Sequence, residues 1–194
     1  TRWTRFYLRK GGALSAEPPD SSESPDSFTN RPALKWGEAV PCVKFTTDPL
    51  SEDVEVTGPA ALYFYASLSA EDAHWMVVIS DISVDRSEKL VTKGWLKASH
   101  REVDGNRSKP YQPYHPHTRA TPVVPGKIYE YAIDIRETSY VFKAGHRIQL
   151  KIKGQDTQWE EKTLHYHLPR AREILHTIHH DSKYPSYVLF PVIT

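Results

Sequence analysis

The sequence predicts an all-β protein with little helix, folded as an antiparallel sandwich or barrel. Its 15 prolines and 11 tyrosines among 194 residues disfavour long helices and suit short strands. Several segments alternate apolar and polar side chains with a period of two, as half-buried strands do. A long, proline-rich connection at about residues 101–127 favours a jelly-roll or Greek-key sandwich over an up-and-down meander.

The N-terminal part is predicted as one strand followed by a long loop. Residues 3–8 are expected to form the strand, which Gly11 and Gly12 end. Residues 15–35, which open with SAEPPDSSESPDSF, are rich in proline, serine and acidic residues and contain few aliphatic ones. Such a segment buries too little apolar surface to order itself, so it is predicted as a surface loop or linker within a single domain of residues 1–194.

The middle of the chain contains the clearest strands. In residues 62–68 every second side chain is apolar, which indicates one buried face. Residues 74–84 are apolar on both faces and indicate a central strand. Residues 90–102 are expected to form the next strand, with Gly94 at a β-bulge.

Strands are also predicted in the C-terminal half. Residues 129–135 and 148–152 alternate, and residues 173–180 and 185–193 are expected to close the sheet. The TSYVF segment, residues 138–142, is expected to make one turn between strands. Residues 163–175 are ambiguous, although Pro169 argues against a continuous helix.

Composition excludes several classes of function. The formal net charge is +1, which gives no electrostatic case for binding nucleic acid or a membrane surface. The single cysteine, Cys42, cannot form an internal disulfide. Without a secretion signal at its start, the chain is expected to be cytoplasmic. It begins at Thr1 with a strand-like segment, so we expect a piece of a longer protein.

Two histidine pairs raise the alternative of a metal-dependent jelly-roll enzyme. His115 and His117, and likewise His165 and His167, are spaced so that a strand would place both rings on one face. The positions four and five residues after each pair hold no carboxylate, so a third ligand is missing. We therefore expect no metal and no cofactor, and we interpret these histidines as surface or interface residues.

Catalysis by a serine nucleophile finds no support in the sequence. The chain contains no G-x-S-x-G motif, which an α/β-hydrolase needs for its nucleophile, so no catalytic residue is predicted. The tryptophans leave open a carbohydrate-binding module on the same fold, with Trp36 and Trp159 as exposed platforms. Trp75 and Trp95 lie in apolar strands and are expected in the core.

The Gly145-His146-Arg147 tripeptide precedes the strand at residues 148–152. Glycine there suits a turn with positive φ. His146 shares its side of the strand with Ile148, so its ring should point toward the core and needs a hydrogen-bond partner. Arg147 lies on the polar side and should pair outward or with a partner domain. We interpret the tripeptide as a structural signature and not as a catalytic pair.

Four segments resemble one known family in the same order: DPLSEDVEVTGPAALYFYASLSAEDAHWMVVISDIS, GWLKASHRE, PGKIYEYAIDIRETSYVFKAGHRIQLKI and HHDSKYPSYVLFPVI. They are similar to the C-terminal domain of the CocE/NonD (cocaine-esterase-like) and X-Pro dipeptidyl-peptidase serine hydrolases. The resemblance covers about residues 45–193. It implies a jelly-roll sandwich similar to galactose-binding domains.

The resemblance also implies a function. In this family the catalytic Ser, Asp and His lie in an upstream α/β-hydrolase domain, and the C-terminal domain packs on it and helps wall the substrate cleft. The chain would then be the accessory domain of an acyl esterase, amidase or X-Pro dipeptidyl-peptidase, with that upstream domain as its partner and homo-oligomerisation left open. Residues 71–74 and 154–167 depart from the family pattern, so substrate preference does not carry over.

Overall fold

The computed structural model describes residues 1–31, 34–157 and 172–193 and confirms an all-β fold with little helix. Two short 3₁₀ turns, η1 (Lys10–Gly12) and η2 (Ala98–His100), interrupt the strands. The strands of the described residues are β1 (Arg2–Arg9), β2 (Ala13–Ser15), β3 (Asp26–Asn30), β4 (Cys42–Thr46), β5 (Val54–Leu68), β6 (His74–Ile82), β7 (Glu88–Lys97), β8 (Tyr129–Phe142), β9 (Arg147–Lys153), β10 (Ile174–His179) and β11 (Tyr187–Ile193). No helix in these ranges is long and apolar enough to cross a membrane.

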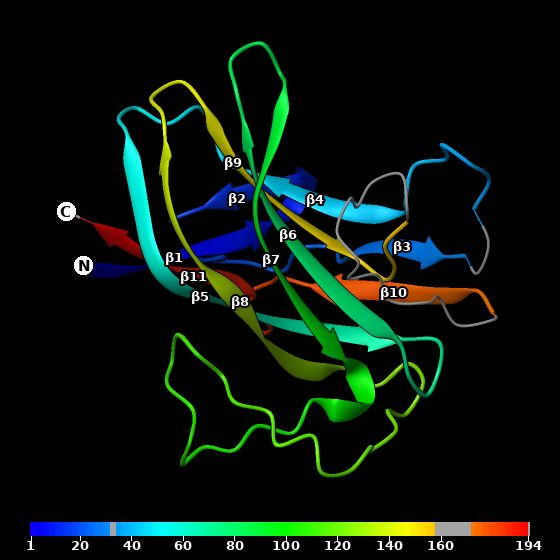
Figure 1. The fold of residues 1–194 in the computed structure, drawn as a ribbon. Coiled ribbons are helices and arrows are strands. Elements are labelled where there is room, and N and C mark those ends of the chain that lie inside the picture. Colours follow the sequence, from blue (N-terminus) through cyan, green and yellow to red (C-terminus); the bar gives the residue numbers. More distant parts are fainter. Residues whose placement is uncertain (32–33, 158–171, 194) are drawn as a thin grey trace.

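The strands form one sheet that folds back on itself into a sandwich. Its order is β11-β1-β2-β4-β9-β6-β7-β8-β5-β10-β3, and β11 also pairs with β5. The second pairing of β11 joins the two layers into a closed, barrel-like arrangement (Figure 1). Neighbouring strands are antiparallel except β2 and β4, as expected for a jelly roll.

Aromatic side chains from both layers fill the core. The Trp75 ring meets Phe64 edge-on at a centroid distance of 5.1 Å and lies 5.3 Å from Tyr131, and all three are fully buried. An edge-to-face pair such as Trp75–Phe64 adds about 0.5–1.5 kcal/mol beyond the burial of area. The predicted inward face of residues 62–68 is confirmed, since its four apolar side chains are all buried.

The loop predicted at residues 15–35 is wrong for part of its length. Asp26–Asn30 form β3, which pairs with β10 and buries Phe28 and Asn30. The sequence of β3 shows little preference for a strand. The segment is extended because it pairs with the edge of β10.

The turn predicted at residues 138–142 is also wrong. β8 continues through these residues to Phe142, paired with β5 from Val54 to Gly58. The partner strand supplies the hydrogen bonds that keep the segment extended.

Gly94 has a different role from the predicted bulge. The irregular step between β6 and β7 lies between Ile79 and Ser80. Gly94 is instead the point where β7 pairs with β8, opposite Ile135. A Cβ atom added there would lie 2.5 Å from the carbonyl oxygen of Asp134, so only glycine lets the two backbones approach so closely.

The long connection after η2 is present as predicted and is fastened to the sandwich by backbone hydrogen bonds. Thr121 N–H donates to the carbonyl of Ser99 at 2.7 Å, and Val123 N–H donates to that of Glu71 at 2.8 Å. Figure 1 shows this connection as a green loop along one end of the sandwich.

Candidate functional site

The Gly145-His146-Arg147 turn joins two segments that are distant in the sequence. Gly145 has φ +81°, in the left-handed region that favours glycine. Its N–H donates to the carbonyl of Leu50 at 2.8 Å, and Leu50 N–H donates to the carbonyl of His146, also at 2.8 Å. The turn therefore pairs with the segment that precedes β5, through two reciprocal backbone bonds.

Side chains strengthen this junction. Asp53 accepts a hydrogen bond from the backbone N–H of Ala144 at 2.8 Å. Arg147 donates to the carbonyl of Thr47 at 2.7 Å and lies 3.8 Å from Asp48. Arg147 thus contacts the segment before β5, and its pairing with a partner domain stays a prediction.

His146 has a buried carboxylate as its partner. Its Nδ1 lies 3.0 Å from both carboxylate oxygens of Asp81, and Tyr140 Oη donates to the same carboxylate at 2.8 Å. The Asp81 side chain is 6% exposed. Burial, together with the hydrogen bond and charge of Asp81, raises the pKa of Tyr140 to about 12, so the phenol stays a donor at neutral pH. Asp81 thus ties the ends of β6, β8 and β9 together.

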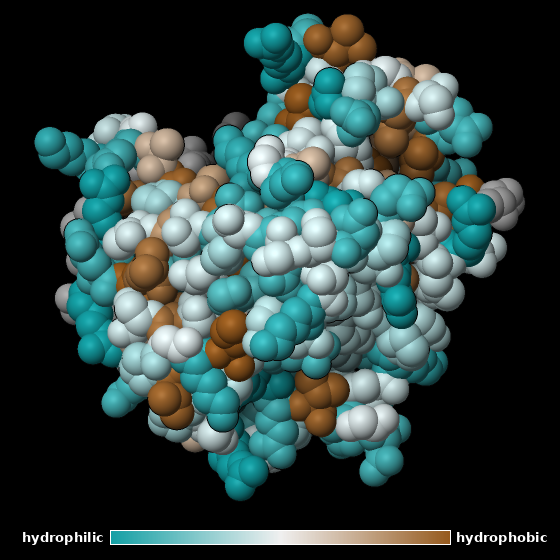
Figure 2. Space-filling view, turned by 180° about the vertical axis from the view of Figure 1, so that it is seen from behind, coloured by the Kyte–Doolittle hydropathy of each residue, from teal (hydrophilic) through white to brown (hydrophobic). Residues whose placement is uncertain are grey.

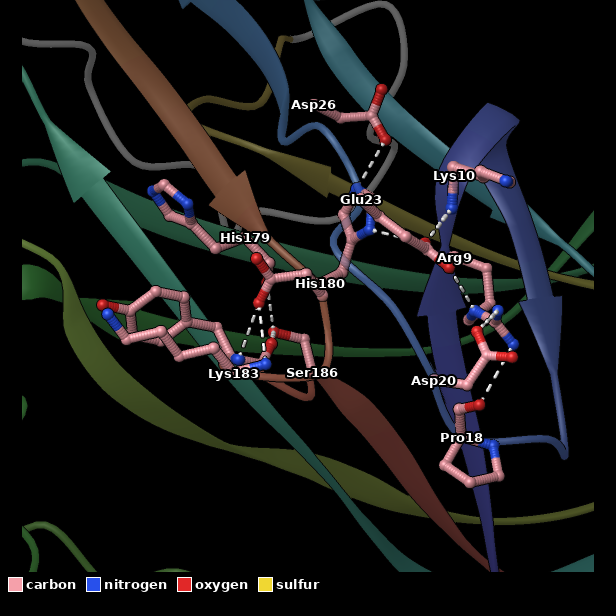
Figure 3. Close-up of polar contacts among 12 residues, drawn as sticks. Arg9, Lys10, Pro18, Asp20, Glu23, Asp26, His179, His180, Lys183 and Ser186 are labelled. Carbon is pink, nitrogen blue, oxygen red and sulfur yellow. Dashed lines mark hydrogen bonds and ion pairs between the residues drawn. The ribbon is translucent and has the colours of Figure 1, made fainter.

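A second buried cluster, which the sequence did not predict, lies around His180 (Figure 3). Its Nδ1 is 3.3 Å from Glu23 Oε2 and its Nε2 is 3.0 Å from Asp26 Oδ2. His180 is fully buried, and the Glu23 side chain is 1% exposed. Glu23 also accepts from Arg9 Nε at 2.8 Å and from the backbone N–H of Lys10 at 2.6 Å.

The cluster favours the ionised form of the Glu23 carboxyl. Burial acts to raise the pKa of its carboxyl, but hydrogen bonds from Lys10 N–H and from Arg9 outweigh burial, so the pKa is lowered overall. The cluster joins the end of β1, η1, the segment before β3, the first residue of β3 and the residue after β10. Because up to 157 positions separate the partners, no local spacing in the sequence could have revealed the cluster.

Among the described residues, the rings of the two carboxylate-bound histidines contact carboxylates and no serine hydroxyl. The partner of His146 is Asp81, and those of His180 are Glu23 and Asp26. Ser67 Oγ lies 3.5 Å from His179 Nε2, at the outer limit of a hydrogen bond. These contacts are structural links within the sandwich.

Of the two histidine pairs considered as metal ligands, the structure describes His115 and His117, and His115 contacts backbone carbonyls. Both ring nitrogens of His115 face backbone carbonyls, those of Glu102 at 2.9 Å and Ala132 at 2.8 Å. Burial, with His115 and His100 nearby, lowers the pKa of His117. His165 and His167 lie outside the described residues. Within residues 1–31, 34–157 and 172–193, no group of three or more His, Cys, Asp or Glu is placed to hold a metal.

The tryptophans lie in different settings. Trp75 is fully buried, as predicted, and Trp95 is partly buried. Trp36 is 78% exposed, and Trp3 is 38% exposed and stacks on Tyr111. Trp159, the second platform expected for a carbohydrate-binding module, lies outside the described residues.

Comparison with known proteins places the chain in one family. The model of the X-Pro dipeptidyl-peptidase C-terminal non-catalytic domain matches residues 1–189. The cocaine esterase of Rhodococcus sp. is 28% identical over 156 residues, which is 77% of this chain and 25% of that protein. This chain spans 18–25% of the length of the curated relatives it matches.

Solved structures show the same fold. A CocE/NonD family hydrolase from Staphylococcus aureus matches 100% of this chain with a TM-score of 0.87 and 21% identity, over 36% of its own length. An aminopeptidase from a marine sediment Thaumarchaeota archaeon matches 100% of the chain with a TM-score of 0.77 and 19% identity, over 37% of its length. The fold is therefore that of one domain of larger proteins.

Proposed function

Because the chain belongs to the family of X-Pro dipeptidyl-peptidase C-terminal non-catalytic domains, we propose that it is the accessory domain of a serine hydrolase. The catalytic serine, aspartate and histidine would lie in an upstream α/β-hydrolase domain. The observation that carries this proposal is the extent of the match: the family model covers residues 1–189, whereas the chain covers only 36% of a matched hydrolase.

The reaction proposed for the whole protein is acyl transfer from an ester, an amide or an X-Pro peptide. A serine nucleophile would form an acyl-enzyme, which water then hydrolyses. This chain would contribute no reacting group. Its role would be to stabilise the catalytic domain and to close one side of the substrate cleft.

The polar clusters of the sandwich suit such a supporting role. Asp81 and Glu23 are buried carboxylates with two or more donors each, so the ends of several strands are held in one arrangement. A rigid domain can wall a cleft without losing conformational entropy when substrate binds.

The test compares this domain with the longer protein that carries it. We expect the longer protein to hydrolyse a p-nitrophenyl ester and to lose that activity after treatment with a serine-directed inhibitor. The purified domain should be inert toward the same ester. Turnover by the domain alone that the same inhibitor abolishes would contradict the proposal.

A further inference from the structure

We propose that a groove between β1 and the long connection binds a short, extended peptide that contains proline and acidic residues. We call it the Trp3 groove. It has a volume of about 640 Å³, and its lining includes Arg2, Trp3, Arg5, Tyr7, Pro18 and Tyr111. The inference goes beyond the proposed function, because it gives this domain a ligand of its own.

The alternation of side chains along β1 places the groove on the outer surface of the sandwich. Phe6 and Leu8 pack into the core. Trp3, Arg5 and Tyr7 therefore face outward, because successive side chains of a strand point to opposite faces. The ring of Trp3 belongs to a residue that is 38% exposed, and Arg5 is exposed as well. These side chains can be reached by a ligand from solvent.

A stacked pair of rings joins the two sides of the groove. Trp3 and Tyr111 of the long connection stack with ring centroids 4.2 Å apart and an interplanar angle of 5°. Next to Tyr111, the carbonyl of Pro110 accepts a hydrogen bond from Tyr63 Oη of β5 at 2.9 Å. This bond holds the connection against the sheet. The rings are thus positioned before a ligand arrives, which lowers the entropy lost on binding.

Aromatic rings in a groove favour proline in the ligand. Proline-rich peptides dock into grooves lined by aromatic side chains, and their polyproline II conformation is already extended before they bind. The chain's own Pro18 lies in the lining, and Arg9 Nη1 donates to its carbonyl at 3.3 Å (Figure 3). Pro18 belongs to the sequence EPPD, residues 17–20. A segment with the composition proposed for the ligand is therefore already in contact with the groove.

Charge favours acidic residues in the ligand. The lining contains two arginines, Arg2 and Arg5, and no carboxylate among the residues that the structure describes. The Arg5 guanidinium lies 4.7 Å from the centroid of the Tyr187 ring. A guanidinium that stacks on a ring still presents N–H donors at its edge, where a carboxylate binds well. The groove is thus complementary in charge to a peptide that bears Asp or Glu.

The surface suits a short peptide better than a large apolar partner. On the side of the molecule drawn in Figure 2, hydrophobic residues are scattered among hydrophilic ones. In the Trp3 groove the contacts come from tryptophan, tyrosine and arginine, the residue types that supply most binding energy at interfaces. A few such anchors are enough to hold a peptide of several residues.

The experiment measures peptide binding to the longer protein that carries this domain, by fluorescence anisotropy. The probe is a fluorescein-labelled EPPDEPPD peptide with an amidated C-terminus. The control peptide KPPKKPPK keeps proline and reverses the charge, whereas EAADEAAD keeps the charge and removes proline. Trp3→Ala and Arg5→Gln alter the groove. Trp36→Ala is the matched control, because Trp36 is 78% exposed and does not line the groove. Unchanged circular dichroism confirms that each variant folds.

We expect the acidic proline peptide to bind, and we expect Trp3→Ala to weaken its binding about tenfold or more, as the loss of a central aromatic anchor does. Arg5→Gln should weaken binding and reduce its dependence on salt, since one charge pair is lost. Both control peptides should bind more weakly than the probe, and Trp36→Ala should leave binding of the probe unchanged.

Several results would overturn the inference. One is the absence of binding at millimolar probe, and another is binding that neither Trp3→Ala nor Arg5→Gln changes. Equal affinity for KPPKKPPK or EAADEAAD would remove the role assigned to charge or to proline. A dimer in sedimentation that Trp3→Ala dissociates would assign the groove to a second copy, and displacement of the probe by maltohexaose would assign it to a carbohydrate.

Discussion

At the residue scale, the histidine and the arginine that stand next to each other at the start of β9 have separate partners. The imidazole binds a buried carboxylate, and the arginine binds a backbone carbonyl of the same chain. Sequence parity correctly indicated that His146 needs a partner. It could not identify Asp81, because 65 positions separate the two residues.

Replacing His146 with alanine should lower stability by about 1–3 kcal/mol, because Asp81 loses one of its two donors while remaining buried. Tyr140→Phe removes the other donor. The double variant should be destabilised by an amount that differs from the sum of the two, since both side chains share one carboxylate. Urea unfolding of the three variants measures this coupling. If His146→Ala left stability unchanged but abolished turnover of the longer protein, the structural interpretation would be wrong.

Glu23 makes stability depend on pH in a defined direction. Its folded-state pKa lies below the ordinary value of 4.5, so its stabilising effect is complete above about pH 4.5 and is lost as pH falls through the lowered folded value. Glu23→Gln should therefore be less stable than the wild type at pH 7, and the difference should shrink as the solution is acidified. Thermal unfolding between pH 3 and pH 7 measures it. A difference that grows on acidification would contradict the assigned direction.

At the element scale, the sequence predicted strands whose own residues alternate and missed those that depend on a partner. β6, β9 and the second half of β5 have strong apolar patterns and occur where expected, whereas β5 begins already at Val54. β3 and the end of β8 lack such patterns and are extended because β10 and β5 pair with them. The register of a strand and the identity of its neighbours are set by the tertiary structure, so a local sequence pattern does not reveal them.

Gly94 was predicted to lie at a β-bulge, but it lies where β7 approaches β8 closely. A glycine within a strand indicates either a bulge or a close approach of backbones, and the sequence cannot distinguish them. Gly94→Ala would place its Cβ 2.5 Å from the Asp134 carbonyl oxygen and 2.9 Å from a methyl carbon of Ile133. We expect a loss of about 1–3 kcal/mol or more, as for other overpacked sites.

The matched control for this prediction is Gly105→Ala, because an added Cβ at Gly105 meets no atom within 4 Å. Its free energy of unfolding should stay within about 0.5 kcal/mol of the wild type, as is usual at open surface positions. Equal destabilisation by both variants in urea would mean that the close approach of β7 to β8 is not what requires glycine at position 94.

At the scale of the whole molecule, the chain is an all-β sandwich of the X-Pro dipeptidyl-peptidase C-terminal non-catalytic domain family. Its core is continuous from β1 to β11. The carboxylate–histidine pairs Asp81–His146 and Glu23–His180 hold strands and the segment before β3 in place. In the proposed function, the domain acts through the neighbouring hydrolase domain.

This leads to a prediction about the longer protein. Deleting this domain should leave the upstream triad able to react with a small fluorophosphonate probe, because the nucleophile and its base lie elsewhere in the proposed arrangement. Turnover of a peptide or ester substrate should fall much more than probe labelling, because one wall of the cleft is missing and bound substrate is held less well. Labelling rate and kcat/KM, measured on a truncated protein shown to be folded by circular dichroism, separate the two effects. Equal loss of both would mean that the domain supports the fold of the hydrolase and not its cleft, and full retention of kcat/KM would show that it does neither.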